Sequence, residues 1–270
     1  MRLTNTSTQR TYRYLRLSLV GAAFALAVAV VQVLVTVGPV VSISATFYTP
    51  ARDVFVGVLF AISLALIALS GHSWEQVLLD LAALFAPMMA VVPTTVTAGS
   101  VPGLDPGCPA PCVPADAIDG IRLGMTTLVI VAVAGLATAV VLGVVQRTLG
   151  RGEALALTAA AIIVAGAAWW AVADPHGFVL HGHDVAAACF FALLAAAAVV
   201  SAIAAHGRWR VAYAAIATLM VLDLLWLMLV RDLLPGESIA LALFAVFWLV
   251  QTVERWNEID PAGILPTTSR

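Results

Sequence analysis

The sequence of 270 residues contains no lysine and few charged residues of any kind. Charged residues make up 10% of it and hydrophobic residues 62%, whereas roughly a quarter of an average soluble domain is charged. A soluble globule of this size could not bury so much apolar surface, so that class is excluded. Without a lysine amine there is no group to form a retinal Schiff base, which excludes a rhodopsin. The net charge of −2 gives no reason to expect nucleic acid as a partner.

Long apolar runs fill most of the chain. Runs of about twenty apolar residues match the hydrocarbon thickness of a bilayer, roughly 30 Å. In lipid, backbone polar groups must be paired within a helix or in a closed barrel, and these Ala-, Val- and Leu-rich runs lack the alternation of barrel strands. The sequence therefore predicts an all-α, polytopic transmembrane helical bundle whose partner is the lipid bilayer.

Eight membrane spans are expected, and a seven-span version that merges two weaker segments is the alternative. The expected spans are 17–41, 52–70, 77–96, 121–146, 153–173, 184–206, 210–231 and 238–255. They form a single domain, 17–256, flanked by polar segments at 1–16 and 257–270. The first span is interpreted as uncleaved, because its apolar part is longer than the roughly 7–15 residues of a secretory signal.

The arginines indicate which side each end of the chain occupies. With eight spans, only Arg52, Arg122 and Arg231 lie opposite the termini, so ten of the thirteen basic residues lie on the side of the termini. Basic residues concentrate in cytoplasmic loops, which predicts that both termini are cytoplasmic.

An Ala-, Val-, Leu- and Gly-rich chain that uses arginine instead of lysine is typical of a bacterial genome with high GC content. The expected location is the bacterial cytoplasmic (inner) membrane, with the chain crossing it several times.

A Pro- and Gly-rich loop, residues 99–115, separates the third and fourth spans and contains Cys108-Pro-Ala-Pro-Cys112. The arginine distribution places it on the outer face, where an oxidising compartment would permit a disulfide. A disulfide is favoured over two unbridged thiols. A metal site is the weaker alternative, because no second thiol pair or nearby histidine completes a zinc ligand set.

The carboxylate that lies farthest from the ends of its predicted span is Asp223, in 210–231. A charged group near the middle of a bilayer costs at least a few kcal/mol, so its presence needs a reason. One interpretation is a carboxylate that faces the bundle interior and binds a proton, an ion or a metal. The other is a neutral aspartic acid that is hydrogen-bonded to a neighbouring helix.

The segment between the fifth and sixth spans is rich in histidine, with His181, His183 and Asp184 close together. Imidazole and carboxylate groups are ordinary zinc ligands, and His-Gly-His would bring two rings together on one short loop. The hypothesis is a metal site formed by Asp53, His181 and His183, with Asp184 or Ser44 in a supporting or catalytic role. A metal-bound water there could attack an ester, amide or phosphate of a lipid. The alternative is an ordinary polar loop in which Asp184 caps the sixth helix.

Short segments in the second, third and sixth spans carry a family resemblance; they are Ser42-Ile43-Ser44, Phe47-Tyr48-Thr49, Arg52-Asp53-Val54-Phe55-Val56-Gly57, Pro93-Thr94, His181 and Phe190-Phe191. They resemble a family of bacterial multispanning membrane proteins that is distantly similar to the superfamily of alkaline ceramidases and adiponectin-receptor-type proteins. This resemblance implies a metal-dependent hydrolase of lipid amides or esters, and it nominates Ser44, Asp53 and His181. The His-x-x-x-His pair that those hydrolases carry on a late helix is absent from the last two spans.

Three functional hypotheses follow. The leading one is a metal-dependent hydrolase of lipid-like substrates, with zinc as the candidate metal and the site at the outer face. The second is a proton- or ion-coupled transporter that uses Asp223. The third is a noncatalytic subunit or sensor that packs against a partner membrane subunit or a second copy of itself. Small residues such as Gly124, Gly135 and Gly143 would allow the close helix contacts of the third hypothesis.

Overall fold

The computed structural model describes residues 7–69, 73–108, 111–147 and 150–256. In these ranges the chain forms eight α-helices and one 3-10 helix, which confirms the predicted all-α bundle. The helices are α1 (Ser7–Thr36), η1 (Ser44–Tyr48), α2 (Arg52–Ala68), α3 (Trp74–Val91), α4 (Ala115–Gln146), α5 (Arg151–Ala173), α6 (Pro175–Ala204), α7 (Gly207–Leu229) and α8 (Leu233–Glu254).

Seven of the eight α-helices in the described ranges are long and apolar enough to cross a membrane. The exception is α2, which is the shortest at 17 residues and spans about 25 Å at ~1.5 Å per residue. It packs against α1 and α3 inside the bundle. The protein is therefore a multi-pass membrane protein, built on all eight of the helices that the apolar runs predict.

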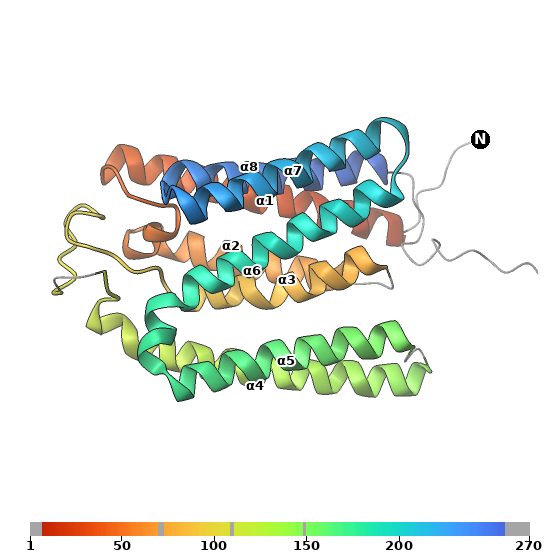
Figure 1. The fold of residues 1–270 in the computed structure, drawn as a ribbon, viewed down its shortest axis with the longest axis horizontal. Helices are drawn as coiled ribbons and strands as arrows, with labels where there is room; N and C mark the ends of the chain where they lie inside the picture. Colours follow the sequence, from red (N-terminus) through yellow and green to blue (C-terminus); the bar gives the residue numbers. More distant parts are fainter. Residues whose placement is uncertain (1–6, 70–72, 109–110, 148–149, 257–270) are drawn as a thin grey trace, which may run out of the picture.

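The helices run up and down the long axis of the molecule, so their connections gather at two opposite ends (Figure 1). At one end, here called the terminal end, α1 begins and α8 finishes. Arg13 joins them there, because its Nε donates to the Trp256 carbonyl oxygen at 2.7 Å. The other end, here called the loop end, carries η1 and the loop from 92 to 114. Which end faces the cytoplasm stays a prediction, and the predicted tail 257–270 and residues 1–6 lie outside the described residues.

The core lies among α1, α2, α3, α6, α7 and α8. Small residues let the central helices approach closely: Ala82, Ala83 and Ala86 of α3 and Ala186 and Ala197 of α6 are completely buried. The hairpin of α4 and α5 lies to one side (Figure 1). Only three residues of α4 are buried, and α5 has no buried residue in its described part. The exposed apolar surface of the α4–α5 hairpin is the kind of surface that lipid covers.

Two helices begin earlier than the predicted spans. Helix α1 begins at Ser7, ten residues before the predicted start of the first span. Helix α6 begins at Pro175 and not at 184, with Asp174 as its N-cap; the Asp174 side chain accepts a hydrogen bond from the Gly177 N–H at 2.9 Å. The polar residues that follow are therefore helical. The histidine-rich segment is part of a helix and not a loop.

Candidate functional site

A cavity of about 940 Å³ lies at the loop end among α1, α2, α3, α6, α7 and α8. This volume falls within the range of roughly 300–1,000 Å³ that ligand pockets occupy. Its polar lining residues are Ser44, Thr94, Thr95, His181, His183, Asp184, Arg231 and Glu237. Four residues that the sequence nominates thus line one cavity: Ser44 from one segment, and His181, His183 and Asp184 from another.

The polar and apolar parts of the cavity lie at different depths. On α8, Glu237 is followed towards the membrane interior by Ala240, Leu241 and Phe244. On α6, the polar residues end at Asp184, and Phe190 and Phe191 lie deeper. Seven helical residues cover about 10 Å, so the apolar wall extends about that far below the polar groups. The cavity is polar towards the loop end, here called its mouth, and apolar towards the middle of the bundle, here called its depth.

Glu237 holds Ser44 with both of its carboxylate oxygens. The Ser44 N–H donates to Oε2 at 2.9 Å, and the Ser44 hydroxyl donates to Oε1 at 3.0 Å. The N-cap of η1, Ile43, supplies no capping side chain, so the first N–H of this 3-10 helix is satisfied by a side chain from α8. Sequence reasoning does not select Glu237, because its partner lies 193 residues away.

His183 is buried and is oriented by the backbone. Its Nδ1 lies 2.8 Å from the Val92 carbonyl oxygen, and since a carbonyl can only accept, Nδ1 carries the hydrogen. In the neutral ring the lone pair is then on Nε2. The neighbouring Gly182 allows α6 to approach Val92: a Cβ at this position would lie 3.3 Å from Val92 Cγ1. The cavity therefore contains an imidazole of defined tautomer.

Helical geometry separates the two nominated histidines. Successive residues turn by 100°, so His181 and His183 point about 200° apart around α6, and Asp184 lies between them on the cavity side. Asp184 interacts electrostatically with both His183 and Glu237. The alternative in which Asp184 caps the sixth helix is wrong, because Asp174 is the cap. Asp184 is instead the central charged group of the cavity wall.

The structure does not assemble the predicted zinc site. Asp53 lies in the first turn of α2, where it is exposed and does not line the cavity. Across the described residues, no three His, Cys, Asp or Glu side chains are placed to hold a metal ion. The physical reason is that the His-Gly-His segment is helical, which turns its two imidazoles away from each other. The described residues do not fit a zinc ion.

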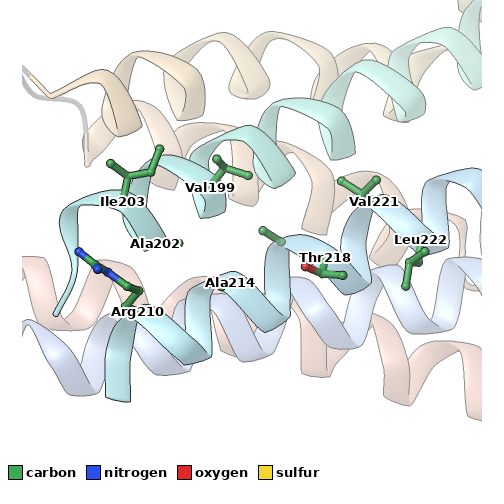
Figure 2. Close-up of a pocket in the computed structure, with 9 residues that line it drawn as sticks. Val199, Ala202, Ile203, Arg210, Ala214, Thr218, Val221 and Leu222 are labelled. Carbon is green, nitrogen blue, oxygen red and sulfur yellow. The ribbon is translucent and has the colours of Figure 1, made fainter. Parts of the chain in front are cut away.

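Asp223 is buried, at 7% exposure, and its Oδ1 has no hydrogen-bond partner in the part of the chain that the structure describes. It does not line the loop-end cavity. It also does not line a second hollow, a groove of about 680 Å³ between α6 and α7 (Figure 2). The transport hypothesis needs Asp223 on the wall of an aqueous cavity, and the position of Asp223 gives that hypothesis no support.

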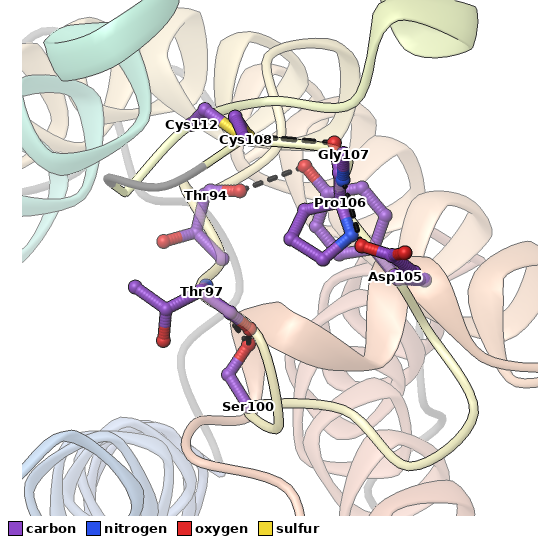
Figure 3. The surroundings of a disulfide bond; sticks show 9 residues. Thr94, Thr97, Ser100, Asp105, Pro106, Gly107, Cys108 and Cys112 are labelled. Carbon is purple, nitrogen blue, oxygen red and sulfur yellow. Dashed lines mark hydrogen bonds between the residues drawn. A yellow bond between two sulfur atoms is a disulfide. The ribbon is translucent and has the colours of Figure 1, made fainter.

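The loop from 92 to 114 forms one wall of the cavity and is held at several points. Cys108 and Cys112, for which the sequence predicts a disulfide, lie together as a close pair (Figure 3). Val96 and Cys112 exchange backbone hydrogen bonds of 2.8 and 3.0 Å. The Tyr48 hydroxyl donates to the Thr94 carbonyl oxygen at 2.8 Å, and burial raises the pKa of the Tyr48 phenol, which keeps this donor protonated. Thr94, Thr95 and Pro111 of the loop face the cavity.

Comparisons of the chain with protein-family models, with curated proteins and with solved structures found no match. The resemblance to the alkaline ceramidase superfamily therefore stays a prediction.

Proposed function

We propose that this membrane protein binds a lipid-like amphiphile in the loop-end cavity. The head group would lie at the mouth, near Glu237, Asp184 and His183, and the chain would lie in the apolar depth. The observation that carries the proposal is the division of one 940 Å³ cavity into a polar mouth and an apolar depth. Such a division fits a molecule that is itself polar at one end.

The polar mouth determines selectivity. Burying a methylene group from water is worth about 0.8 kcal/mol, but an amphiphile that enters from the bilayer already has its chain in hydrocarbon, so chain burial adds little. The two carboxylates, Asp184 and Glu237, and the single cation, Arg231, make the mouth rich in hydrogen-bond acceptors. It suits a head group with hydroxyl or amine donors. Changes at the mouth should therefore affect binding more than changes in the depth that preserve volume.

The test of binding is to count the amphiphiles that remain on the purified protein by native mass spectrometry. Ala188 lines the cavity and Ala192, four residues further along α6, is exposed and does not. We expect Ala188→Phe, which fills the cavity, to lose the bound molecule and Ala192→Phe to keep it. We also expect Glu237→Gln to lower its occupancy. Equal retention by Ala188→Phe and Ala192→Phe would disprove binding in this cavity.

One observation favours a second candidate function, hydrolysis of an ester or amide bond in the bound amphiphile. The Ser44 hydroxyl donates to the Glu237 carboxylate at 3.0 Å, which is the arrangement of a nucleophile and its general base. Ser44 Oγ would attack the carbonyl carbon while Glu237 takes the hydroxyl proton. Glu237 would then protonate the leaving oxygen or nitrogen, and water would hydrolyse the acyl-serine in the same way.

The test of hydrolysis uses a long-chain p-nitrophenyl ester and follows release of p-nitrophenol. Ser44→Ala keeps the backbone N–H that binds Glu237 and removes only the hydroxyl. Ser238 is exposed on α8 and donates to the Leu234 carbonyl oxygen, so Ser238→Ala is the matched control. We expect Ser44→Ala to abolish cleavage and Ser238→Ala to retain it. If Ser44→Ala cleaved the ester at the rate of the parent, the hydrolysis hypothesis would be disproved and the binding proposal would stand.

A further inference from the structure

The groove between α6 and α7 is separate from the loop-end cavity, since the two share no lining residue. It has a volume of about 680 Å³ and is lined by Val199, Ala202, Ile203, Arg210, Ala214, Ala217, Thr218, Val221 and Leu222. All but two of these side chains are apolar. Arg210 lies beside the turn that joins α6 to α7, and the apolar residues continue along both helices away from it (Figure 2). The groove is thus apolar along its length and cationic at one end.

The length of the groove matches half a bilayer. Leu222 is twelve residues beyond Arg210 on α7, which is about 18 Å along the helix. The hydrocarbon of one leaflet is about 15 Å thick. Val199, Ile203 and Leu222 are exposed on the groove walls, and the small side chain of Ala217 lies buried in it. A single acyl chain can lie along this path with its head group at the level of Arg210.

Positive charge is concentrated at the same end. Arg210 Nε donates to the Ala205 carbonyl oxygen at 3.1 Å, while the two terminal nitrogens of its guanidinium have no hydrogen-bond partner among the described residues. Arg208 is two residues away and stacks on the ring of Trp209. The first turn of α7 contains no acidic residue, and its N-cap, His206, supplies no capping side chain. The positive end of the helix dipole therefore adds to the charge of the arginines.

We propose that this groove binds an anionic phospholipid, with the phosphate on Arg210 and one acyl chain along α6 and α7. The site recognises net negative charge, because no carboxylate is among the described residues that line the groove, and none could there bind the cationic part of a zwitterionic head group. It is independent of the loop-end cavity and of the function proposed there. The membrane supplies the ligand directly, by lateral diffusion from one leaflet.

The experiment is a titration of the detergent-purified protein with phosphatidylglycerol or with phosphatidylcholine of the same chains, in which native mass spectrometry counts the bound lipids. The parent for all variants is Ala188→Phe, so that lipid in the loop-end cavity is not counted. We expect phosphatidylglycerol to bind more tightly than phosphatidylcholine. Arg210→Gln should weaken phosphatidylglycerol binding about fivefold, the effect of one basic residue near an anionic lipid surface.

Matched variants separate the groove from general charge and surface effects. Arg147 is exposed and remote in sequence from the groove, so Arg147→Gln should leave phosphatidylglycerol binding unchanged. Ala214 lines the groove and the adjacent Ala215 does not; Ala214→Leu should reduce binding of the lipid and Ala215→Leu should not. The proposal is overturned if Arg210→Gln binds phosphatidylglycerol as the parent does, if the two lipids bind equally, or if Ala214→Leu has no effect.

Discussion

The two ends of the bundle use similar polar side chains in opposite ways. At the terminal end, the carboxylate of Glu75 is buried on α3 and is bound from α8 on both oxygens. Arg255 lies 2.5 Å from Oε2, and the Gln251 amide donates to Oε1. The Tyr213 hydroxyl donates to Glu254 at 2.5 Å, which joins α7 to α8. These contacts close the terminal end around its own polar groups.

At the loop end, the carboxylate of Glu237 is also bound, by Ser44, but the polar groups around it face a cavity. Asp184, His181 and Arg231 are exposed to that space. A buried charge that pairs within the protein fixes helix contacts, whereas polar groups that line a hollow in a membrane protein mark where a ligand or an ion is handled. The comparison separates a carboxylate that pairs within the bundle, Glu75, from polar groups that face a cavity, around Glu237.

The largest expected effect comes from breaking the ion pair at the terminal end. Arg255→Gln leaves Glu75 buried without its cation, which costs about 3 kcal/mol of the free energy of unfolding. Thermal unfolding in detergent, followed by tryptophan fluorescence, measures the loss. Arg231→Gln at the loop end removes an exposed arginine and should change stability by about 0.5 kcal/mol or less. If the two variants were destabilised equally, the distinction between a paired, buried carboxylate and polar groups that face a cavity would fail.

Within the loop end, the next largest effect should come from His183. His183→Ala removes the donor to the Val92 carbonyl oxygen and leaves that acceptor buried, which costs about 1–3 kcal/mol. The same substitution at the exposed His181 should be nearly neutral for stability, so the pair His183→Ala and His181→Ala is compared in one thermal unfolding series. Similar midpoints for the two variants would show that the hydrogen bond to Val92 does not hold α6 against α3.

A smaller effect is expected at Gly236, where α8 crosses α7 beside the cavity. A Cβ at Gly236 would meet Leu227, whose side chain lines the cavity. The Cβ would clash with Cδ2 and Cγ of Leu227, but this side chain borders the cavity and has room to shift. Gly236→Ala should therefore cost only about 1 kcal/mol, the lower end of the range for overpacking, and should reduce amphiphile retention. Gly120 on α4 has open space around it. Gly120→Ala is therefore the control for replacing a helical glycine by alanine. If both variants retained the amphiphile equally, Gly236 would not shape the cavity.

The sequence predicts the eight helices because each is a long apolar run, which depends only on local composition. The start of α6 could also have been found: Asp174 followed by Pro175 is a helix N-cap followed by a favoured first residue. The zinc prediction assumes that the segment from His181 to His183 is a loop. This segment is helical in the structure, so the predicted zinc site does not form. The bond between Ser44 and Glu237 could not have been found, since nothing in one sequence specifies which residue lies across a bundle from another.

An effect no larger than that at Gly236 should come from Tyr48, which ties the loop from 92 to 114 to η1. Tyr48→Phe removes one hydrogen bond, to the Thr94 carbonyl oxygen, and should cost about 1 kcal/mol of the free energy of unfolding. Tyr14→Phe, at an exposed tyrosine on α1, should cost less.

The pH dependence of stability tests the burial of Tyr48 directly. Burial raises its pKa above the ordinary value of 10.0, so the unfolded chain loses this proton first as pH rises. The advantage of the parent over Tyr48→Phe should therefore be constant below pH 10 and shrink above it. A constant difference through pH 11 would mean that Tyr48 titrates normally and that the loop does not hold it buried.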